Sequence, residues 1–375
     1  MRIAIDIRKY QDFGIGTYVR NLVDHLGRID RETEYVLLSR PQDRGRIALP
    51  GPNFRTVPEP AGSHSVAEQF RIPLALQREH VDLYHSPHYV LPPLIHCRSV
   101  VTVHDCIHLM FPQYFPGRLA HTYAHVQMWL AVQRANRVLT VSETSKQDIL
   151  RRFRIPADKV TVVYNAIDER LAAPPSLEDI DRVQGRYQLN DPFALYVGNI
   201  KPHKNLERLI EAFHEVRRQP GMDALKLVII GDEISKYQGL RRAVHQFKLH
   251  KHVRFLGFVA LDTLSVLYRL ARVFVFPSLY EGFGLPPLEA MSVGTPVVTS
   301  NTSSLPEVVG DAAVLVDPYS SASIAEGIHR ALVDDDLRAT LRERGIARAR
   351  EFSWASSVQQ IHAAYTEVME QAEPL

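Results

Sequence analysis

The chain has 375 residues, of which 45% are hydrophobic and 23% charged, a composition typical of globular proteins. Its two cysteines, Cys97 and Cys106, are too few for a disulfide scaffold and indicate a reducing compartment. We see no signal peptide and no apolar run of the roughly 18 residues that a membrane span needs. We therefore expect a cytoplasmic protein, and at roughly 100–200 residues per domain we expect two domains.

The net charge of +2 hides an asymmetry along the chain. Residues 1–165 contain 21 Lys/Arg and 15 Asp/Glu, whereas residues 166–375 contain 23 and 27. Chance is one explanation. The other is a basic N-terminal half that approaches an anionic partner, such as a diphosphate-linked acceptor or the inner face of a membrane. Nucleic acid is disfavoured, because no Lys/Arg-rich run has interleaved aromatic residues.

The first half of the chain alternates strand and helix patterns. Residues 2–7 predict a strand buried on both faces, and residues 17–26 carry apolar side chains at helical spacing. Helices are also expected at about 118–136 and after Ser142, which suits an N-cap. Further strands are predicted at residues 35–39, 83–86, 99–104, 138–142 and 160–164.

The pattern lapses at residues 171–190, which we interpret as a linker, and then resumes. Strands are predicted at residues 194–198, 226–231, 253–258, 273–277, 296–300 and 313–316, with helices between them. This alternation predicts an α/β fold with two doubly wound parallel sheets. We place the domains at residues 1–168 and 185–354, with a helix at about 355–375 that packs back on the first domain.

The most informative segment is residues 281–289, with the sequence EGFGLPPLE. It follows a predicted strand and predicts a glycine loop and then a helix, because prolines are favoured in a helix's first turn. Such a helix start binds anions. Yet the carboxylates of Glu281 and Glu289 flank it. A ligand that needs both features is part anion and part polyol, as a sugar nucleotide is.

A glycine turn follows the first predicted strand. Gly14 and Gly16 lack the third glycine of a dinucleotide fingerprint, which disfavours a nicotinamide dehydrogenase. Their position favours backbone contact with a phosphate or sugar, and an ordinary tight turn is the alternative.

A second loop runs from Gly198 to Asn205, between a predicted strand and a predicted helix. It places Lys204 where a cation can meet a diphosphate near a helix start. The alternative is a solvated loop lysine.

His104 and Asp105 end another predicted strand, which is a position suited to a cleft in a doubly wound domain. A structural histidine is the alternative. His104/His108 and His121/His125 have a spacing that can hold a metal on a helix. No carboxylate completes a clear ligand set, so we expect no metal.

In this order the segments resemble family 4 of the retaining GT-B glycosyltransferases over nearly the whole chain. The segments that carry the resemblance are residues 14–16, 103–105, 141–145, 165–168, 197–205, 277–289 and 294–298. The resemblance implies the GT-B fold, in which two Rossmann-like domains face a central cleft. It also implies transfer of a hexose from a nucleoside diphosphate sugar without a metal cofactor.

The resemblance implies separate roles within residues 281–289. Glu289 binds the ribose hydroxyls of the nucleotide, and Glu281 engages the donor sugar. The loop after Glu281 adds backbone contacts to the sugar and the distal phosphate. That loop consists of Gly282, Phe283, Gly284 and Leu285.

The resemblance also assigns the other motifs. Lys204 neutralises the diphosphate leaving group, and the turn from Gly14 to Gly16 approaches that diphosphate. His104 lies near the transferred sugar. The remaining donor-side positions are Gly198 and Asn199 at the phosphates and the backbone of Phe258 and Val259 at the base.

One departure guides the choice of donor. Many family members have an arginine where this chain has Asn199. Those with the wording G-x-x-x-P-x-K-N, as here, resemble a branch rich in mannosyltransferases, so GDP-mannose is our first expectation. The expected acceptor is a glycan or a polyprenyl-diphosphate-linked glycan. A nucleotide-sugar epimerase and a non-catalytic sugar-nucleotide-binding protein are the alternatives.

Overall fold

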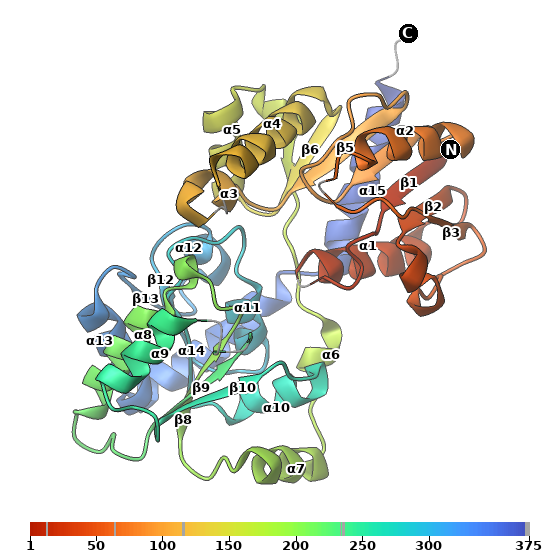
Figure 1. Cartoon of the computed structure of the whole chain (residues 1–375). Coiled ribbons are helices and arrows are strands. Elements are labelled where there is room, and N and C mark those ends of the chain that lie inside the picture. The colour runs from red at the N-terminus through yellow and green to blue at the C-terminus, as the bar shows by residue number, and fades with distance from the viewer. Residues whose placement is uncertain (13, 64, 115–116, 233, 235–236, 372–375) are drawn as a thin grey trace. The chain divides into compact units, whose positions relative to one another are not determined.

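The computed structural model describes residues 1–375 except 13, 64, 115–116, 233, 235–236 and 372–375 (Figure 1). The chain divides into two compact units. Unit 1 comprises Met1–Asn165 and Ser353–Leu375, and unit 2 comprises Ala166–Phe352. Among the described residues, no helix has the length and apolar character needed to cross a membrane.

Unit 1 contains a seven-stranded parallel sheet with the order β3-β2-β1-β4-β5-β6-β7. The strands are β1 (Arg2–Asp6), β2 (Glu34–Ser39), β3 (Phe54–Pro58), β4 (Leu83–Ser86), β5 (Arg98–Val103), β6 (Arg137–Thr140) and β7 (Val160–Val162). All strands are parallel, but the direction in which successive strands are added across the sheet reverses between β1 and β4. Loops that leave the carboxyl ends of these two strands therefore flank a switch point, where α/β proteins bind ligands.

Helices cover both faces of this sheet (Figure 1). They are α1 (Ile15–Ile29), α2 (Glu68–Arg78), α3 (Ile107–Met110), α4 (Arg118–Arg134), α5 (Glu143–Phe153) and α15 (Trp354–Glu370), with short 3-10 turns at Pro41–Arg46, Pro112–Tyr114 and Ala157–Lys159. Apolar side chains of α2, α4 and α5 form one core cluster with alternate residues of the strands. The C-terminal helix α15 packs against α1, β5 and β6.

Unit 2 contains a six-stranded parallel sheet with the order β10-β9-β8-β11-β12-β13. The strands are β8 (Phe193–Val197), β9 (Lys226–Ile230), β10 (Val253–Gly257), β11 (Val273–Phe276), β12 (Val297–Ser300) and β13 (Val314–Val316). Here the reversal lies between β8 and β11. The loops that follow these two strands, residues 198–205 and 277–284, are therefore neighbours at the edge of the sheet.

The helices of unit 2 follow the same alternation. They are α6 (Glu169–Ala172), α7 (Leu177–Tyr187), α8 (Leu206–Arg217), α9 (Gln238–Gln246), α10 (Leu261–Leu270), α11 (Leu285–Ser292), α12 (Leu305–Val309), α13 (Ser321–Val333) and α14 (Asp335–Arg350), with a 3-10 turn at Pro202–Lys204. The predicted fold class, two doubly wound α/β sheets, is confirmed.

The interpretation of residues 171–190 as an irregular linker was wrong. They contain the end of α6 and all of α7, and both helices pack against α10. Side chains cap each start: Asp168 accepts from the Arg170 N–H, and Ser176 accepts from the Asp179 N–H. The prolines between the two helices hid this regularity, since a proline pair reads as a break.

The charge asymmetry changes when it is counted by unit. Residues 353–375 carry three Glu and no Lys or Arg, and they belong to unit 1. Unit 1 therefore has a net charge of +3 and unit 2 of −1. The basic excess expected for the N-terminal half is halved by the helix that returns to it.

Candidate active site

The glycine loop of unit 2 leads directly from a buried strand into α11. Gly284 precedes this helix with φ 110°, in the left-handed region that favours glycine. A Cβ at Gly284 would lie 2.7 Å from Leu305 Cδ2, so a side chain there would strain the backbone angle and displace Leu305. Pro286 and Pro287 lie in the first turn of α11, where a missing N–H leaves no bond unmade. The loop and helix start predicted from the sequence are thus present.

Two serines from another segment fix the shape of this loop. The Ser304 hydroxyl donates to the carbonyls of Glu281 (3.0 Å) and Phe283 (2.8 Å). The Glu281 N–H donates to Ser303 Oγ at 3.0 Å. Sequence reasoning missed both serines, because the segment Thr302–Ser304 resembles an ordinary polar turn. They hold the backbone of Glu281 in place.

Lys204 and Glu281 form an ion pair. Lys204 Nζ lies 2.7 Å from Glu281 Oε1 and 2.9 Å from Oε2, and the two side chains are 13% and 12% exposed. Lys204 Nζ also lies 5.0 Å from the ring centroid of Phe276. The switch point between β8 and β11 explains why residues 77 positions apart meet. Two groups predicted to hold the same ligand are therefore adjacent, and each neutralises the other.

Asn205 holds the lysine loop in place. It adopts a left-handed conformation with φ 62°. Its amide donates to the carbonyls of Pro277 (3.0 Å) and Pro318 (2.6 Å). This links the loop after β8 to the loop after β11, so Asn205 determines where Lys204 stands relative to Glu281.

Glu289 lies apart from that ion pair, in the second turn of α11. Its carboxylate accepts a 2.8 Å bond from Tyr268 Oη on α10. Burial raises the pKa of Glu289 to about 7, and the Tyr268 bond only partly opposes this. The group therefore titrates near neutral pH, and a ligand that donates hydroxyl bonds to it would favour the ionised form. Tyr268, which is fully buried, was not found from the sequence.

The other donor-side positions surround the ends of β8 and β10. Gly198 has φ 152°, and a Cβ there would lie 2.9 Å from Tyr196 Oη. Tyr196 Oη donates to the Asn199 carbonyl at 3.2 Å. Phe258 is 72% exposed, and Val259 beside it is buried. These residues therefore present backbone and an aromatic ring, rather than charge, at this part of the edge.

In unit 1 the glycine turn begins α1. Gly14 has φ 69°, and a Cβ on Gly16 would lie 2.7 Å from the Tyr10 carbonyl oxygen and 2.9 Å from that of Lys9. The left-handed backbone angle favours glycine at position 14, and the close carbonyl oxygens require it at position 16. The tight-turn explanation holds for this motif, and a ligand-binding role for its backbone remains a prediction.

His104 lies at the carboxyl end of β5. Its Nε2 donates to the Pro87 carbonyl at 3.0 Å, and the ring of Tyr18 meets its ring edge-on with centroids 4.9 Å apart. Burial lowers the pKa of His104 to about 4, so the ring is neutral at physiological pH. With Nε2 protonated, Nδ1 is the acceptor. Asp105 has a structural contact: Oδ1 accepts from the Ile107 N–H at the start of α3.

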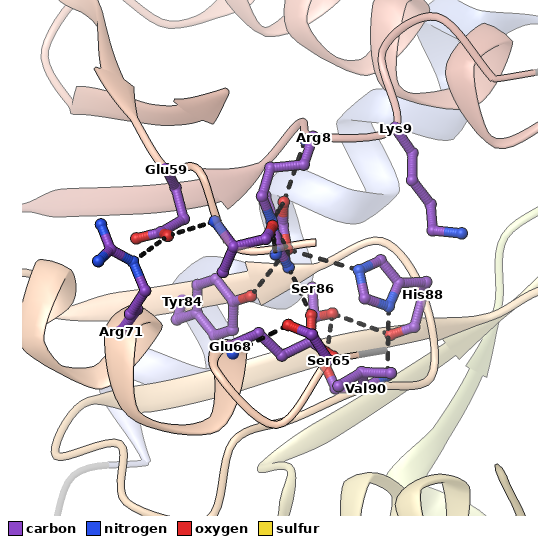
Figure 2. A network of polar contacts seen from close by, with 12 residues as sticks. Arg8, Lys9, Glu59, Ser65, Glu68, Arg71, Tyr84, Ser86, His88 and Val90 are labelled. Atoms are coloured by element: carbon purple, nitrogen blue, oxygen red, sulfur yellow. Dashed lines mark hydrogen bonds and ion pairs between the residues drawn. The ribbon is translucent and has the colours of Figure 1, made fainter. Parts of the chain in front are cut away.

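A buried ionic network lies at the ends of β1 and β4 in the same unit. Figure 2 shows the side chains of Arg8, Glu68, Tyr84 and His88 converging. Arg8 Nη2 lies 2.6 Å from Asp6 Oδ2 and 3.0 Å from Glu68 Oε2. His88 Nε2 lies 3.4 Å from the same Asp6 oxygen.

Two carboxylates in this network share one guanidinium. Burial opposes ionisation of Asp6, yet the Arg8 guanidinium outweighs it and holds the pKa of Asp6 low. Burial raises the pKa of Glu68. Sequence reasoning did not find this network, because Arg8 and Glu68 are 60 positions apart and single charges near a strand end are common.

Metal ligation receives no geometric support in the part of the chain that the structure describes. No group of three or more His, Cys, Asp or Glu side chains there is placed to hold an ion. The i,i+4 histidine pairs do not form such a group. Cation chemistry at the site is available instead from Lys204.

Comparison with known proteins decides the family. Residues 178–348 match the family described as Glycosyl transferases group 1, and residues 14–171 match Glycosyltransferase Family 4. An O-antigen chain mannosyltransferase B from Escherichia coli is 33% identical over 95% of this chain and 97% of its own length. The chain belongs to glycosyltransferase family 4. This glycosyltransferase is thus an enzyme of the predicted class, and the epimerase and the non-catalytic binding protein are not favoured.

Other relatives differ in the share of each chain that the match covers. The serotype-specific mannosyltransferase WbdA of Escherichia coli is 30% identical over 74% of this chain, but the match spans only 34% of that longer protein. A D-inositol 3-phosphate glycosyltransferase from Corynebacterium glutamicum is 25% identical over 95% of this chain and 92% of its own.

Solved structures show the same fold. A sucrose-phosphate synthase from Thermosynechococcus elongatus superposes with a TM-score of 0.80 at 21% identity, covering 99% of this chain and 100% of that one. Anabaena HepE, solved with UDP-glucose, gives a TM-score of 0.76 at 20% identity, covering 98% and 100%. The predicted GT-B architecture is confirmed.

Proposed function

We propose that this glycosyltransferase transfers a mannosyl residue from GDP-mannose to a growing glycan, with retention of anomeric configuration and without a metal ion. The observation that carries the proposal is the Lys204–Glu281 pair at the start of α11, with the titratable carboxylate of Glu289 on the same helix. Mannosyl transfer is suggested by the names of the Escherichia coli relatives, two of which are O-antigen or serotype-specific mannosyltransferases.

In the proposed reaction the bond between mannose C1 and the β-phosphate oxygen breaks, and both electrons leave with GDP. The acceptor oxygen bonds to C1 on the same face, and its proton passes to the departing phosphate oxygen. Negative charge grows on the diphosphate, so a fixed cation and aligned N–H groups stabilise the transition state. Lys204 and the backbone N–H groups of residues 283–285, directly before the two prolines of α11, supply these charges, with Lys204 exchanging Glu281 for phosphate.

Glu289 serves the nucleotide in this proposal. Its carboxylate accepts from the ribose hydroxyls while Tyr268 Oη holds it from behind. Glu281, released from Lys204, accepts from a hydroxyl of the sugar. His104, neutral and with an accepting Nδ1, is proposed to contact the sugar from unit 1.

A direct test uses a panel of nucleotide sugars. A ligand that binds only the folded state raises its stability by RT ln(1 + [L]/Kd), so we expect GDP-mannose to raise Tm most. Transfer is then measured from labelled GDP-mannose to an undecaprenyl-diphosphate glycan, and the anomer is read by NMR. A UDP-sugar that alone shifts Tm would overturn the donor assignment. An inverted anomer would overturn retention.

We further propose that unit 1 meets the acceptor at a membrane surface. Its helices α2 and α4 expose Phe70 and Leu74, and Val126 and Trp129, respectively. Apolar side chains on a surface that also carries arginines suit an interface with anionic lipid. Co-sedimentation with vesicles of phosphatidylglycerol and phosphatidylcholine tests this. Binding unchanged in a Leu74→Gln, Trp129→Gln double variant would contradict it.

A further inference from the structure

A buried chain of polar groups crosses the core of unit 1. Tyr365 Oη on α15 lies 2.6 Å from His85 Nδ1 on β4. His85 Nε2 lies 2.8 Å from Thr102 Oγ1 on β5, and Thr102 Oγ1 lies 3.1 Å from Tyr18 Oη on α1. All four side chains are at most 3% exposed. Four elements from distant parts of the sequence are thereby joined through hydroxyl and imidazole groups.

Stability alone does not account for this chain. Replacing both partners of a buried hydrogen bond by apolar groups of the same shape is often neutral, so an apolar core could hold these elements equally well. The polar groups add hydrogen bonds, which have a preferred direction. Burial lowers the pKa of His85 to about 3, so its ring stays neutral, with one nitrogen donating and the other accepting. Such a chain fixes side-chain orientation as well as distance.

Two members of this chain, Tyr18 at one end and His85 in its interior, lead to predicted site residues. The Tyr18 ring contacts the ring of His104 with centroids 4.9 Å apart. Tyr18 also lies in the first turn of α1, two residues after Gly16. On the other side, His85 is followed after one residue by Pro87, whose carbonyl accepts from His104 Nε2. His104 is therefore held from two directions by residues that belong to, or adjoin, the same chain.

The C-terminal helix contributes a second contact to this arrangement. The ring of Trp354, the first residue of α15, meets Tyr18 edge-on with centroids 5.9 Å apart. Helix α15 packs against α1. Tyr18 is thus braced by α15 at its ring and through the Thr102–His85–Tyr365 chain at its hydroxyl.

We propose that Tyr365, His85 and Thr102 are positioning residues that orient Tyr18 and, through it, His104 and the glycine turn. The returning helix α15 is then part of the framework of the reaction centre. This role rests on the proposed function insofar as His104 contacts the sugar, while the orientation of His104 can be measured without any substrate.

The kinetic test compares variants that remove or keep one hydroxyl. Thr102→Val keeps the shape of the side chain and removes its hydroxyl, whereas Thr102→Ser keeps the hydroxyl. We expect Thr102→Val and Tyr365→Phe each to lower kcat about tenfold with an unchanged donor KM, because small displacements of reacting groups are costly in rate. Thr102→Ser should restore most of kcat. The double variant should be no slower than either single variant.

Tyr35→Phe is the matched control. Tyr35 is also fully buried in unit 1, and its hydroxyl donates to Asp30 Oδ2 at 2.8 Å, but this bond lies at the amino end of β2. We expect a similar loss of Tm with kcat within twofold of the wild type. If Thr102→Val and Tyr365→Phe behave as Tyr35→Phe does, the positioning role is overturned.

A second measurement separates this proposal from the proposed function. Ring 15N and 1H resonances of His104, assigned with His104→Gln, report its orientation beside Tyr18. We expect them to shift in Tyr365→Phe and Thr102→Val, and to stay in place in Tyr35→Phe. Shifts in a protein that transfers no mannose would reject the donor and keep the positioning role. Unmoved resonances would reject the positioning role even in an active mannosyltransferase.

Discussion

The two units use polar groups at their strand ends in opposite ways. In unit 2 the Lys204–Glu281 pair is partly exposed and lies in glycine-containing loops, so each partner can exchange the other for a ligand at low desolvation cost. In unit 1 Asp6, Arg8 and Glu68 are at most 1% exposed, and Arg8 pairs with both carboxylates. Buried charges of this kind are strongly destabilising when one partner is removed. From this comparison we expect the Lys204–Glu281 pair of unit 2 to take part in ligand binding, and the buried ion pairs of unit 1 to keep that unit's structure fixed.

The largest expected effect is on the stability of unit 1. Arg8→Ala leaves two buried carboxylates without their cation, which typically costs about 3–5 kcal/mol. We expect a loss of that size in the free energy of unfolding, measured by urea denaturation. Arg28→Ala, which removes one partner of an ion pair with Asp24 that is 58% and 52% exposed, serves as the control and should cost under about 1 kcal/mol. Equal losses in the two variants would erase the distinction between the units.

Lys204→Ala tests the opposite side of the comparison. Removing one preorganised group that stabilises developing charge typically costs about 3–4 kcal/mol, or a few hundred-fold in rate. We expect kcat to fall by that factor, with a smaller loss of stability than in Arg8→Ala, because the Lys204–Glu281 pair is 13% and 12% exposed rather than fully buried. Lys251→Ala, an exposed lysine of the same unit, is the control. A kcat close to the wild-type value in Lys204→Ala would contradict the assignment of Lys204 to the diphosphate leaving group.

Glu289 predicts a pH dependence with a definite sign. Its pKa of about 7 lies above the ordinary value, so below pH 7 it is protonated and cannot accept from two ribose hydroxyls. We expect the affinity for GDP to fall about tenfold between pH 8 and pH 6, measured by calorimetry. In the ligand-free protein the effect on folding runs the other way: the raised pKa contributes stability that is complete below pH 4.5, and it is lost as pH rises from 4.5 through 7. The Glu289→Gln variant should bind GDP weakly, with an affinity that does not change with pH. If its affinity depends on pH as steeply as that of the wild type, a group other than Glu289 is responsible for the pH dependence.

How far the sequence predicted the molecule depends on the distance over which each feature is determined. The strand–glycine–proline pattern around Gly284 is local, and its loop and helix start are present. Lys204 and Glu281 were assigned to one ligand, and strand order brings them together. The roles of Tyr268, Ser304 and Arg8 were not predicted, because no pattern near them in the sequence indicates their distant partners.

Local patterns also failed where apolar periodicity is weak. Helix α2 and strand β3 were not predicted at all. Val57 and Phe54 are the chief apolar residues of a strand at the edge of the sheet, and α2 contains Pro73. An edge strand needs less apolar surface than a central one, and an internal proline disguises a helix. Helix α2 carries Glu68 of the buried network, and the segment after β3 contains Ala61, whose carbonyl accepts from Arg8 Nη1.

The smallest predicted effect concerns the serine that shapes the glycine loop. Ser304→Ala removes the hydroxyl that donates to the carbonyls of Glu281 and Phe283, so we expect a loss of about 1 kcal/mol of stability. Because the bonded carbonyls flank the loop proposed to bind the donor, the affinity for GDP-mannose should fall as well. Ser356→Ala, on the exposed side of α15, is the control and should change neither quantity. If Ser304→Ala loses stability but keeps full donor affinity, the loop is held well enough by Gly284 and the start of α11. In that case the glycine loop is itself rigid, and the adaptable part of unit 2 is limited to the side chains of the Lys204–Glu281 pair.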